Sequence, residues 1–130
     1  MLDQTGCRMA DRQEVIKLLI IGDGACGKTC LLDRFEKKEF IDDVYTPTVF
    51  HNTSVEMAHP EKPGSTFKMQ LWDTAGQEEF EEARKVCYRG SNVVIVAFDI
   101  AVPHSLTSDI EAVWLKELQT MDLKGTPVIT

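Results

Sequence analysis

Two nearly continuous apolar runs, residues 15–22 and 92–99, dominate the hydrophobic pattern of the chain. Apolar runs of this length without polar alternation are typical of strands buried on both faces of a parallel sheet. The first run leads into a glycine-rich turn, and from residue 27 to residue 38 apolar side chains recur at helical spacing. This part of the sequence therefore predicts a buried strand, a glycine loop and a helix, in that order.

Apolar and polar positions alternate over residues 49–57 and again over residues 67–72, which predicts two half-buried strands. The segment 58–66 between them holds two prolines and one glycine, a composition that suits a loose hairpin tip. Residues 40–50 contain a proline and show no periodicity, so we expect a loop that runs into the first of these strands and is long enough to move.

The second half of the chain predicts two helices around the second buried strand. Residues 73–90 begin as a loop and continue as a short, very acidic helix. A later helix is expected to begin near Ser105 or Ser108, either of which would be a suitable N-cap. Residues 128–130 look like the start of another buried strand. The apolar face of the later helix comprises Ile110, Val113, Trp114, Leu118 and Met121.

Composition narrows the class of protein. The chain has 130 residues, 43% of them hydrophobic, which fits one globular domain, and we expect a flexible tail over residues 1–13 and the domain over residues 14–130. A net charge of −7 argues against a general nucleic-acid binder. The four cysteines form no CxxC pair and no Cys/His cluster, which disfavours a zinc site and favours a reducing, cytoplasmic location. No apolar run is long enough to span a membrane.

Residues 22–29, with the sequence GDGACGKT, match the phosphate-binding pattern G-x-x-x-x-G-K followed by Ser or Thr. The pattern stands where its chemistry requires it, after a strand and before a helix. Backbone N–H groups of such a loop converge on phosphate oxygens, Lys28 would bridge the β- and γ-phosphates, and the Thr29 hydroxyl would reach Mg²⁺. The residues expected to contact nucleotide here are Gly22, Asp23, Gly24, Ala25, Cys26, Gly27, Lys28, Thr29 and Cys30.

The segment LWDTAGQ, residues 71–77, carries a second set of candidate groups. An aspartate at the end of a strand, here Asp73, can hold the water shell of a metal, and the N–H of Gly76 can meet the γ-phosphate. The segment YTPTV adds Thr48, a hydroxyl on a mobile loop that would complete the Mg²⁺ shell when a γ-phosphate is present.

The motifs GDGACGKTCLL, YTPTVF and LWDTAGQEEFE together resemble the phosphate loop, switch I and switch II of the Ras-like small GTPases, and within them the Rho type. The segment YRGSNVVIVAFDI looks more like the Rab or Ras branches, and the resemblance covers residues 15–130. It implies an α/β, three-layer P-loop NTPase fold in which helices flank a mostly parallel, six-stranded sheet. It also implies GTP or GDP with Mg²⁺ as ligands, and two switches that reorder on GTP hydrolysis.

The resemblance also implies roles for single residues. Gly24 would lie where a side chain obstructs catalysis, Lys28 would support catalysis at the phosphates, and Gln77 would orient the attacking water. The Mg²⁺ ligands would be Thr29 and Thr48, with Asp73 acting through water. The remaining implied nucleotide contacts are Gly76 at the γ-phosphate, Phe40 edge-on to the guanine and Tyr45 over the phosphates.

The family pattern also implies regulators. Residues 40–50 contain no arginine that could stabilise the transition state in cis, so we expect slow unaided hydrolysis. An activating protein that supplies this charge would raise the rate by roughly 10³ to 10⁵. Exchange factors and effectors are the other partners that the resemblance implies.

The chain departs from the family pattern at its end. The Asn-Lys-x-Asp and Ser-Ala-Lys motifs that read guanine, the last strand and helix, the Rho insert and the lipidated Cys-a-a-X tail all lie beyond the point where this sequence stops. Plasma-membrane contact would therefore require a longer, lipidated form. We also expect the missing part of the sheet to leave apolar surface exposed over residues 93–98 and on the helix that carries Trp114.

Several smaller features allow two interpretations. Cys26 and Cys30 would be small packing residues or oxidant-sensitive thiols. The acidic residues between positions 78 and 82 would form a docking face for a basic regulator or the solvated start of a helix. Trp72 would be an exchange-factor contact or an ordinary strand aromatic.

The function itself also has alternatives. Besides the nucleotide switch, the sequence fits a non-catalytic interaction module that binds GTPase regulators without cycling nucleotide. A P-loop ATPase or kinase is disfavoured, because DTAGQ supplies a glutamine suited to positioning water and the chain has no recognisable lid.

Overall fold

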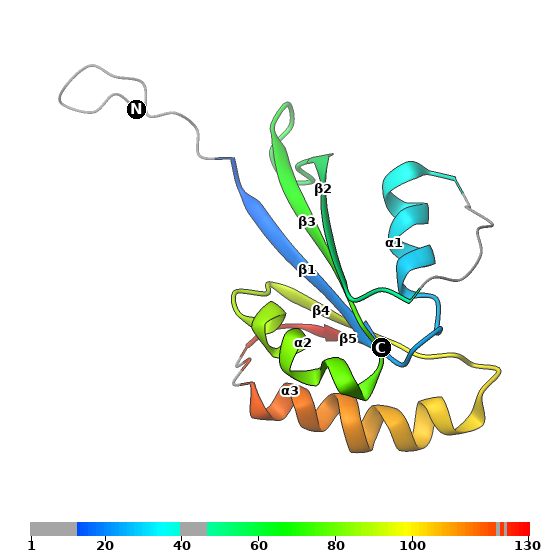
Figure 1. The fold of residues 1–130 in the computed structure, drawn as a ribbon. Coiled ribbons are helices and arrows are strands. Elements are labelled where there is room, and N and C mark those ends of the chain that lie inside the picture. Colours follow the sequence, from blue (N-terminus) through cyan, green and yellow to red (C-terminus); the bar gives the residue numbers. More distant parts are fainter. Residues whose placement is uncertain (1–12, 40–46, 122, 124) are drawn as a thin grey trace.

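The computed structural model describes residues 13–39, 47–121, 123 and 125–130 of the chain. These residues form an α/β fold in which one sheet lies between two layers of helices (Figure 1). None of the described helices is long and apolar enough to cross a membrane. The elements in chain order are β1 (Val15–Gly22), α1 (Lys28–Lys37), β2 (Phe50–Ala58), β3 (Thr66–Thr74), η1 (Glu78–Phe80), α2 (Glu81–Tyr88), β4 (Val93–Ala97), η2 (Ser105–Leu115), α3 (Lys116–Thr120) and β5 (Val128–Ile129).

The sheet has five strands in the order β2-β3-β1-β4-β5. Only β2 runs antiparallel to its neighbour, so β3, β1, β4 and β5 all end at the same edge. In this register Ile20 is paired with Asp73, and Gly22 is paired with Ala97. The glycine loop that follows β1 therefore starts between the ends of β3 and β4, the place where parallel α/β sheets bind ligands.

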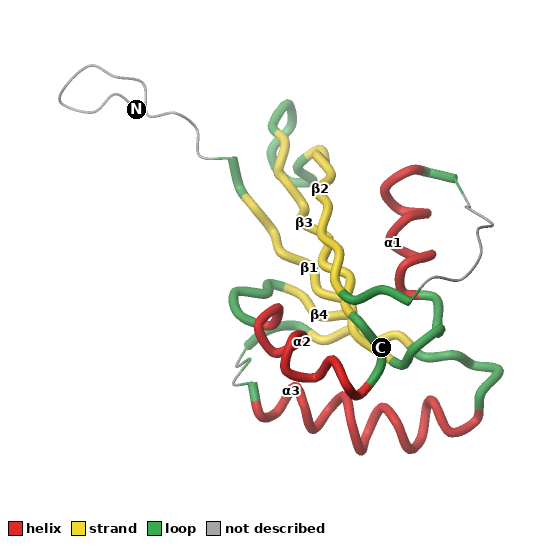
Figure 2. Tube along the Cα trace, in the orientation of Figure 1, coloured by secondary structure: helices red, strands yellow, loops and turns green. Residues whose placement is uncertain are grey.

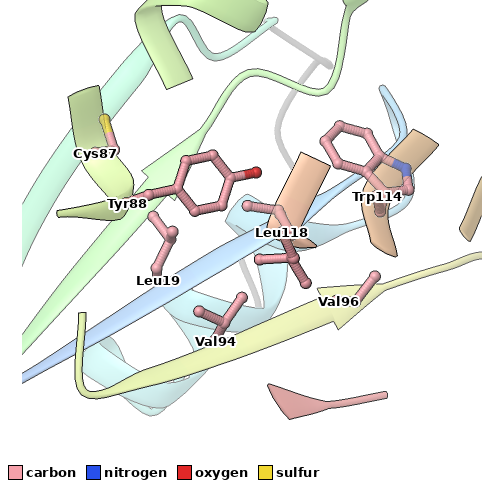
Figure 3. Close-up of a cluster of buried hydrophobic side chains, with 8 residues drawn as sticks. Leu19, Cys87, Tyr88, Val94, Val96, Trp114 and Leu118 are labelled. Atoms are coloured by element: carbon pink, nitrogen blue, oxygen red, sulfur yellow. The ribbon is translucent and has the colours of Figure 1, made fainter. Parts of the chain in front are cut away.

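Helices cover the two faces of the sheet separately, as the tube in Figure 2 shows. On one face α1 packs through Leu32 against Ile20 and Leu71. On the other face α2 and the continuous helix η2–α3 enclose a larger cluster that includes Leu19, Val94 and Val96 from the sheet and Tyr88, Trp114 and Leu118 from the helices (Figure 3). The η2 part of the helix is π-helical, with a wider turn than an α-helix.

One buried charge interrupts the first apolar run. Lys17 in β1 is buried, and its Nζ donates hydrogen bonds to the backbone carbonyls of Cys87, at 2.5 Å, and Arg89, at 2.8 Å. Both carbonyls belong to the C-terminal end of α2, where a cation is favourable. The same ammonium lies 3.7 Å from the ring centre of Trp72. Burial lowers the pKa of Lys17 from its ordinary value.

The structure confirms the predicted α/β class, the strand–loop–helix start, the hairpin and the acidic helix. The prediction of an exposed apolar surface was wrong, because β5 pairs with β4 and Val94, Val96 and Trp114 are all at most 2% exposed. The strand expected at residues 128–130 is present as β5, but the prediction that it is buried was wrong, since Val128 and Ile129 are 44% and 54% exposed. The expected tail falls almost entirely outside the described residues.

Candidate functional site

The loop between β1 and α1 turns back over the end of the sheet. Its first residue, Gly22, has a φ of 141°, and a Cβ there would lie 2.1 Å from the carbonyl oxygen of Ala97. A side chain cannot occupy that space, so glycine is required where β1 leaves the sheet. Ala25 and Gly27 also have left-handed backbones, with φ of 59° and 91°. These turns bring the loop back to the first residues of α1.

Lys28 lies across this loop as the first residue of α1. Its buried Nζ donates hydrogen bonds to the carbonyls of Gly22, at 2.9 Å, and Asp23, at 2.6 Å. The Sγ of Cys26 lies 3.8 Å from the same ammonium. Burial raises the pKa of the Cys26 thiol, and the nearby Lys28 charge opposes this only partly. The positive charge is therefore held inside the loop, and Cys26 is kept as a thiol.

Three oxygen-bearing side chains from separate segments meet beside Lys28. The Thr29 hydroxyl lies 2.8 Å from the Thr48 hydroxyl and donates a hydrogen bond of 2.5 Å to Oδ2 of Asp73. Asp73 is 2% exposed, and burial raises the pKa of its carboxyl. Its other oxygen, Oδ1, is buried without a hydrogen-bond partner in the described part of the chain. An unpaired buried carboxylate oxygen is costly, so this group is poised for a further ligand.

These residues fit Mg²⁺. Mg²⁺ prefers oxygen ligands and is usually bound through one or two protein groups together with substrate phosphates and waters. Thr29, Thr48 and Asp73 provide hydroxyl and carboxylate oxygens at one point, with the orphaned Oδ1 of Asp73 beside them. Within the described ranges no three His, Cys, Asp or Glu side chains gather into a metal cluster of their own. Such a site would depend on oxygens supplied by a ligand.

Gly76 holds the end of β3 against the loop. A Cβ at Gly76 would lie 2.3 Å from the carbonyl carbon of Asp23 and 2.3 Å from the backbone nitrogen of Gly24. The two backbones therefore touch directly, and only glycine permits this approach. The next residue, Gln77, lies beside Gly24, since a Cβ on Gly24 would be 3.7 Å from the Gln77 side-chain amide. The structure thus brings together the two residues expected to control water attack.

A buried ion pair includes an arginine that is hydrogen-bonded to the backbone of the Gln77 segment. Arg84 of α2 donates hydrogen bonds to the carbonyls of Ala75, at 3.0 Å, and Gln77, at 2.6 Å. The same guanidinium pairs with Glu117 of α3 at 3.1 Å, and Tyr88 donates a hydrogen bond of 2.8 Å to that carboxylate. The sequence interpretation missed this network. Its only local signal was Glu117, a charge on the otherwise apolar face of the predicted helix.

Asp23 differs from the expectation in the direction of its side chain. Its carboxylate accepts hydrogen bonds from Ser105 Oγ, at 2.6 Å, and from Trp114 Nε1, at 2.7 Å, both in η2. The prediction that Ser105 or Ser108 is the N-cap was wrong, because both lie within η2, His104 is at the N-cap position, and no described side chain caps this helix. A cavity of about 410 Å³ lies next to this contact. It is lined by Asp23, Gly76, Gln77, Glu79, Arg84, Val113 and Trp114.

Most of the predicted site residues thus converge on one edge of the sheet. Cys30 is exposed on α1, and Cys26, Cys30 and Cys87 are free thiols. Phe40 and Tyr45 lie outside the described residues. Trp72 packs against Phe50, with ring centres 5.3 Å apart, on the β2–β3 side of the sheet.

Comparison with known proteins places these observations in a family. The sequence profile of the Ras family matches residues 17–130. The chain is 45% identical over 113 residues to the GTP-binding protein RHO1 of Saccharomyces cerevisiae, covering 87% of this chain and 51% of that protein. It is 43% identical over 103 residues to the human Rho-related GTP-binding protein RhoB, covering 79% of this chain and 50% of that protein.

The chain thus spans about half the length of the curated relatives it matches. Its fold, with a glycine loop between β1 and α1, is that of a P-loop GTPase domain, and its relatives are of the Rho type. The chain belongs to the Ras family of small GTPases.

Proposed function

We propose that residues 14–130 form a nucleotide-binding domain that takes GTP or GDP with Mg²⁺ and acts as a Rho-like molecular switch. One observation carries the proposal: the hydroxyls of Thr29 and Thr48 and the carboxylate of Asp73 meet at a point beside the buried ammonium of Lys28. Phosphate oxygens need a cation and N–H donors, whereas Mg²⁺ needs oxygens. The cation with its N–H donors and the oxygen ligands are both present at the end of β1.

Nucleotide phosphates would replace the internal partners of Lys28. Its Nζ now donates to two loop carbonyls, and these bonds preorganise the side chain across the loop. Residues 22–29 would wrap the phosphates with their backbone N–H groups at the start of α1, where the helix dipole favours negative charge. Gly76 would present its N–H from the opposite side, where the end of β3 touches the loop.

Thr29 and Thr48 would hold Mg²⁺ directly, and Asp73 would hold it through water. Mg²⁺ held by these residues would supply positive charge that offsets the negative charge of the phosphates. Asp73 accepts a hydrogen bond from the Thr29 hydroxyl at Oδ2, and among the described residues its buried Oδ1 has no partner, so the carboxylate is available to a further ligand. Because Thr48 belongs to a different segment from Thr29, its contact would link the 40–50 loop to the state of the nucleotide.

Gln77 would orient the water that attacks the γ-phosphate. Its side chain lies beside Gly24, and Arg84 donates a hydrogen bond to its backbone carbonyl. No arginine occurs in residues 40–50, so unaided hydrolysis would be slow. Activating proteins, exchange factors and effectors would act on the segments around Thr48 and on the acidic start of α2. A longer, lipidated form would carry this domain from the cytoplasm to the plasma membrane.

Single-turnover hydrolysis of GTP tests the proposal. The chain should release phosphate slowly, and Gln77→Leu should stop the release while the protein still binds nucleotide. Gln119→Leu is the matched control, because Gln119 is an exposed glutamine on α3 away from the loop. If Gln77→Leu hydrolysed GTP as fast as Gln119→Leu and the unaltered chain, the role given to Gln77 would be wrong. If no nucleotide bound, the chain would be an interaction module and the whole proposal would be wrong.

A further inference from the structure

Asp23 is an acidic residue within the predicted phosphate-binding loop, and its side chain points away from that loop. Asp23 is the second residue of the loop, and a carboxylate aimed into the loop would repel phosphate. Instead its Oδ2 accepts a hydrogen bond from Ser105 Oγ at 2.6 Å, and its Oδ1 accepts one from Trp114 Nε1 at 2.7 Å. Both oxygens are turned out of the loop and toward η2.

The two donors are themselves held in place. Trp114 is 2% exposed and belongs to the cluster that contains Leu19, Val96 and Leu118 (Figure 3). The guanidinium of Arg84 lies 4.7 Å from its ring centre. Ser105 is also 2% exposed, and its hydroxyl accepts a hydrogen bond of 3.3 Å from the backbone N–H of Asp99, two residues after the end of β4. The Asp23 carboxylate is thus hydrogen-bonded to two buried side chains of η2.

The two hydrogen bonds of the Asp23 carboxylate join segments that are far apart in the chain. Asp23 is separated from Ser105 by 82 positions and from Trp114 by 91. The backbone of Asp23 also meets Gly76 and accepts a hydrogen bond from Lys28. A shift of η2 would therefore move the backbone that touches both the lysine and the Gln77 segment.

We propose that Asp23 is a positioning residue through which η2 sets the shape of the phosphate loop and the rate at which bound nucleotide leaves. The inference rests on the proposed nucleotide-binding function. It assigns regulation of the site to η2: a partner that moves Trp114 or Ser105 would loosen the loop and release nucleotide. Coupling of this kind is reciprocal, so nucleotide binding must also change the surroundings of Trp114.

The dissociation rate of fluorescent GDP in the presence of Mg²⁺ tests the proposal. Trp114→Phe removes the indole N–H and keeps an aromatic ring, and Ser105→Ala removes only a hydroxyl. Each change deletes one hydrogen bond to a charged acceptor, so each should speed dissociation by roughly tenfold. Trp72→Phe is the matched control, because its indole N–H has no partner in the described part of the chain and it stands away from the loop. It should dissociate GDP like the unaltered chain.

A double-mutant cycle separates positioning from general loosening of the core. In an Asp23→Ala background, Trp114→Phe and Ser105→Ala should add no further acceleration, because the bonds they remove are already absent. If they act only through packing, their effects will be the same in both backgrounds, and the proposal is wrong. Ser105→Ala keeps the test valid even if Trp114→Phe does not fold.

Tryptophan emission gives a second readout. The chain has two tryptophans, so Trp72→Phe leaves Trp114 as the sole indole. Addition of GDP to the nucleotide-free protein should change this emission, and Asp23→Ala should abolish the change. If GDP binds but neither the Trp114 emission nor the GDP dissociation rates of the variants change, the inference is wrong while the proposed function stands. Absence of any GDP binding would overturn the proposed function, and the inference with it.

Discussion

Substitution of Gly76 by alanine is the sharpest steric test of the site. The new Cβ would lie 2.3 Å from two backbone atoms of the loop, the carbonyl carbon of Asp23 and the nitrogen of Gly24. That separation is about 1.1 Å short of the 3.4 Å at which ordinary contact begins. Both colliding partners are backbone, so no side chain can rotate away. The end of β3 and the loop must move apart.

The cost of this movement sets the expected loss of binding. Forcing an extra methyl group into a packed contact costs about 1–3 kcal/mol. If the loop can bind phosphate only in the present shape, a cost of about 2 kcal/mol weakens nucleotide binding roughly thirtyfold. Gly24→Ala is the matched control, because its Cβ would stand 3.7 Å from the Gln77 amide, an ordinary contact.

Fluorescence titration with labelled GDP and single-turnover hydrolysis of GTP distinguish the two glycines. Gly76→Ala should lose affinity, whereas Gly24→Ala should keep affinity and hydrolyse more slowly, since its methyl group touches Gln77. Thermal unfolding without nucleotide would show that both variants fold. Equal affinity of Gly76→Ala and Gly24→Ala for GDP would refute the claim that the backbone contact at Gly76 shapes the loop.

Three further predictions concern buried charges. Burial raises the pKa of Asp73, so ionisation of this carboxyl opposes folding. In EDTA and without nucleotide, the chain should therefore become less stable to urea as the pH rises through the carboxyl range. Asp73→Asn should remove this loss of stability. Arg84→Met leaves the buried Glu117 carboxylate without its cation and should lower the free energy of unfolding in urea by about 3–5 kcal/mol. Lys85→Met, which removes a more exposed ion pair, should change the free energy of unfolding little. Lys17→Met removes two hydrogen bonds to backbone carbonyls and should lower the melting temperature, and Lys68→Met on β3 is its control.

The sequence predicted the parts of the site that depend on local spacing. The glycine loop, Lys28 and Thr29 occupy one short segment, so their arrangement follows from a strand that runs into a helix. The meeting of Thr29 with Asp73, 44 positions later, was expected because the two motifs, through their resemblance to the small GTPases, assign both residues to one Mg²⁺ site. The hairpin of β2 and β3 followed from alternation and from the prolines between the strands.

The sequence could not supply the partners of buried polar groups. Lys17 stands within an apolar run, and its acceptors at the end of α2 are set by how that helix crosses the sheet. Asp23 was assigned to the nucleotide by its place in the motif, but its donors come from η2. The exposure prediction failed because helix side chains such as Tyr88 and Leu118 cover Val94 and Val96, and because the two residues of β5 already pair with β4.

The central claim is that the loop, Lys28 and the three oxygen-bearing side chains form a working nucleotide site. A titration of the 130-residue chain with fluorescent GDP, in Mg²⁺ and in EDTA, with unlabelled GTP and ATP as competitors, tests it most directly. A working site should bind labelled GDP saturably, and the binding should be weakened by EDTA and reversed by unlabelled GTP. No binding, or binding that is indifferent to EDTA, would contradict it.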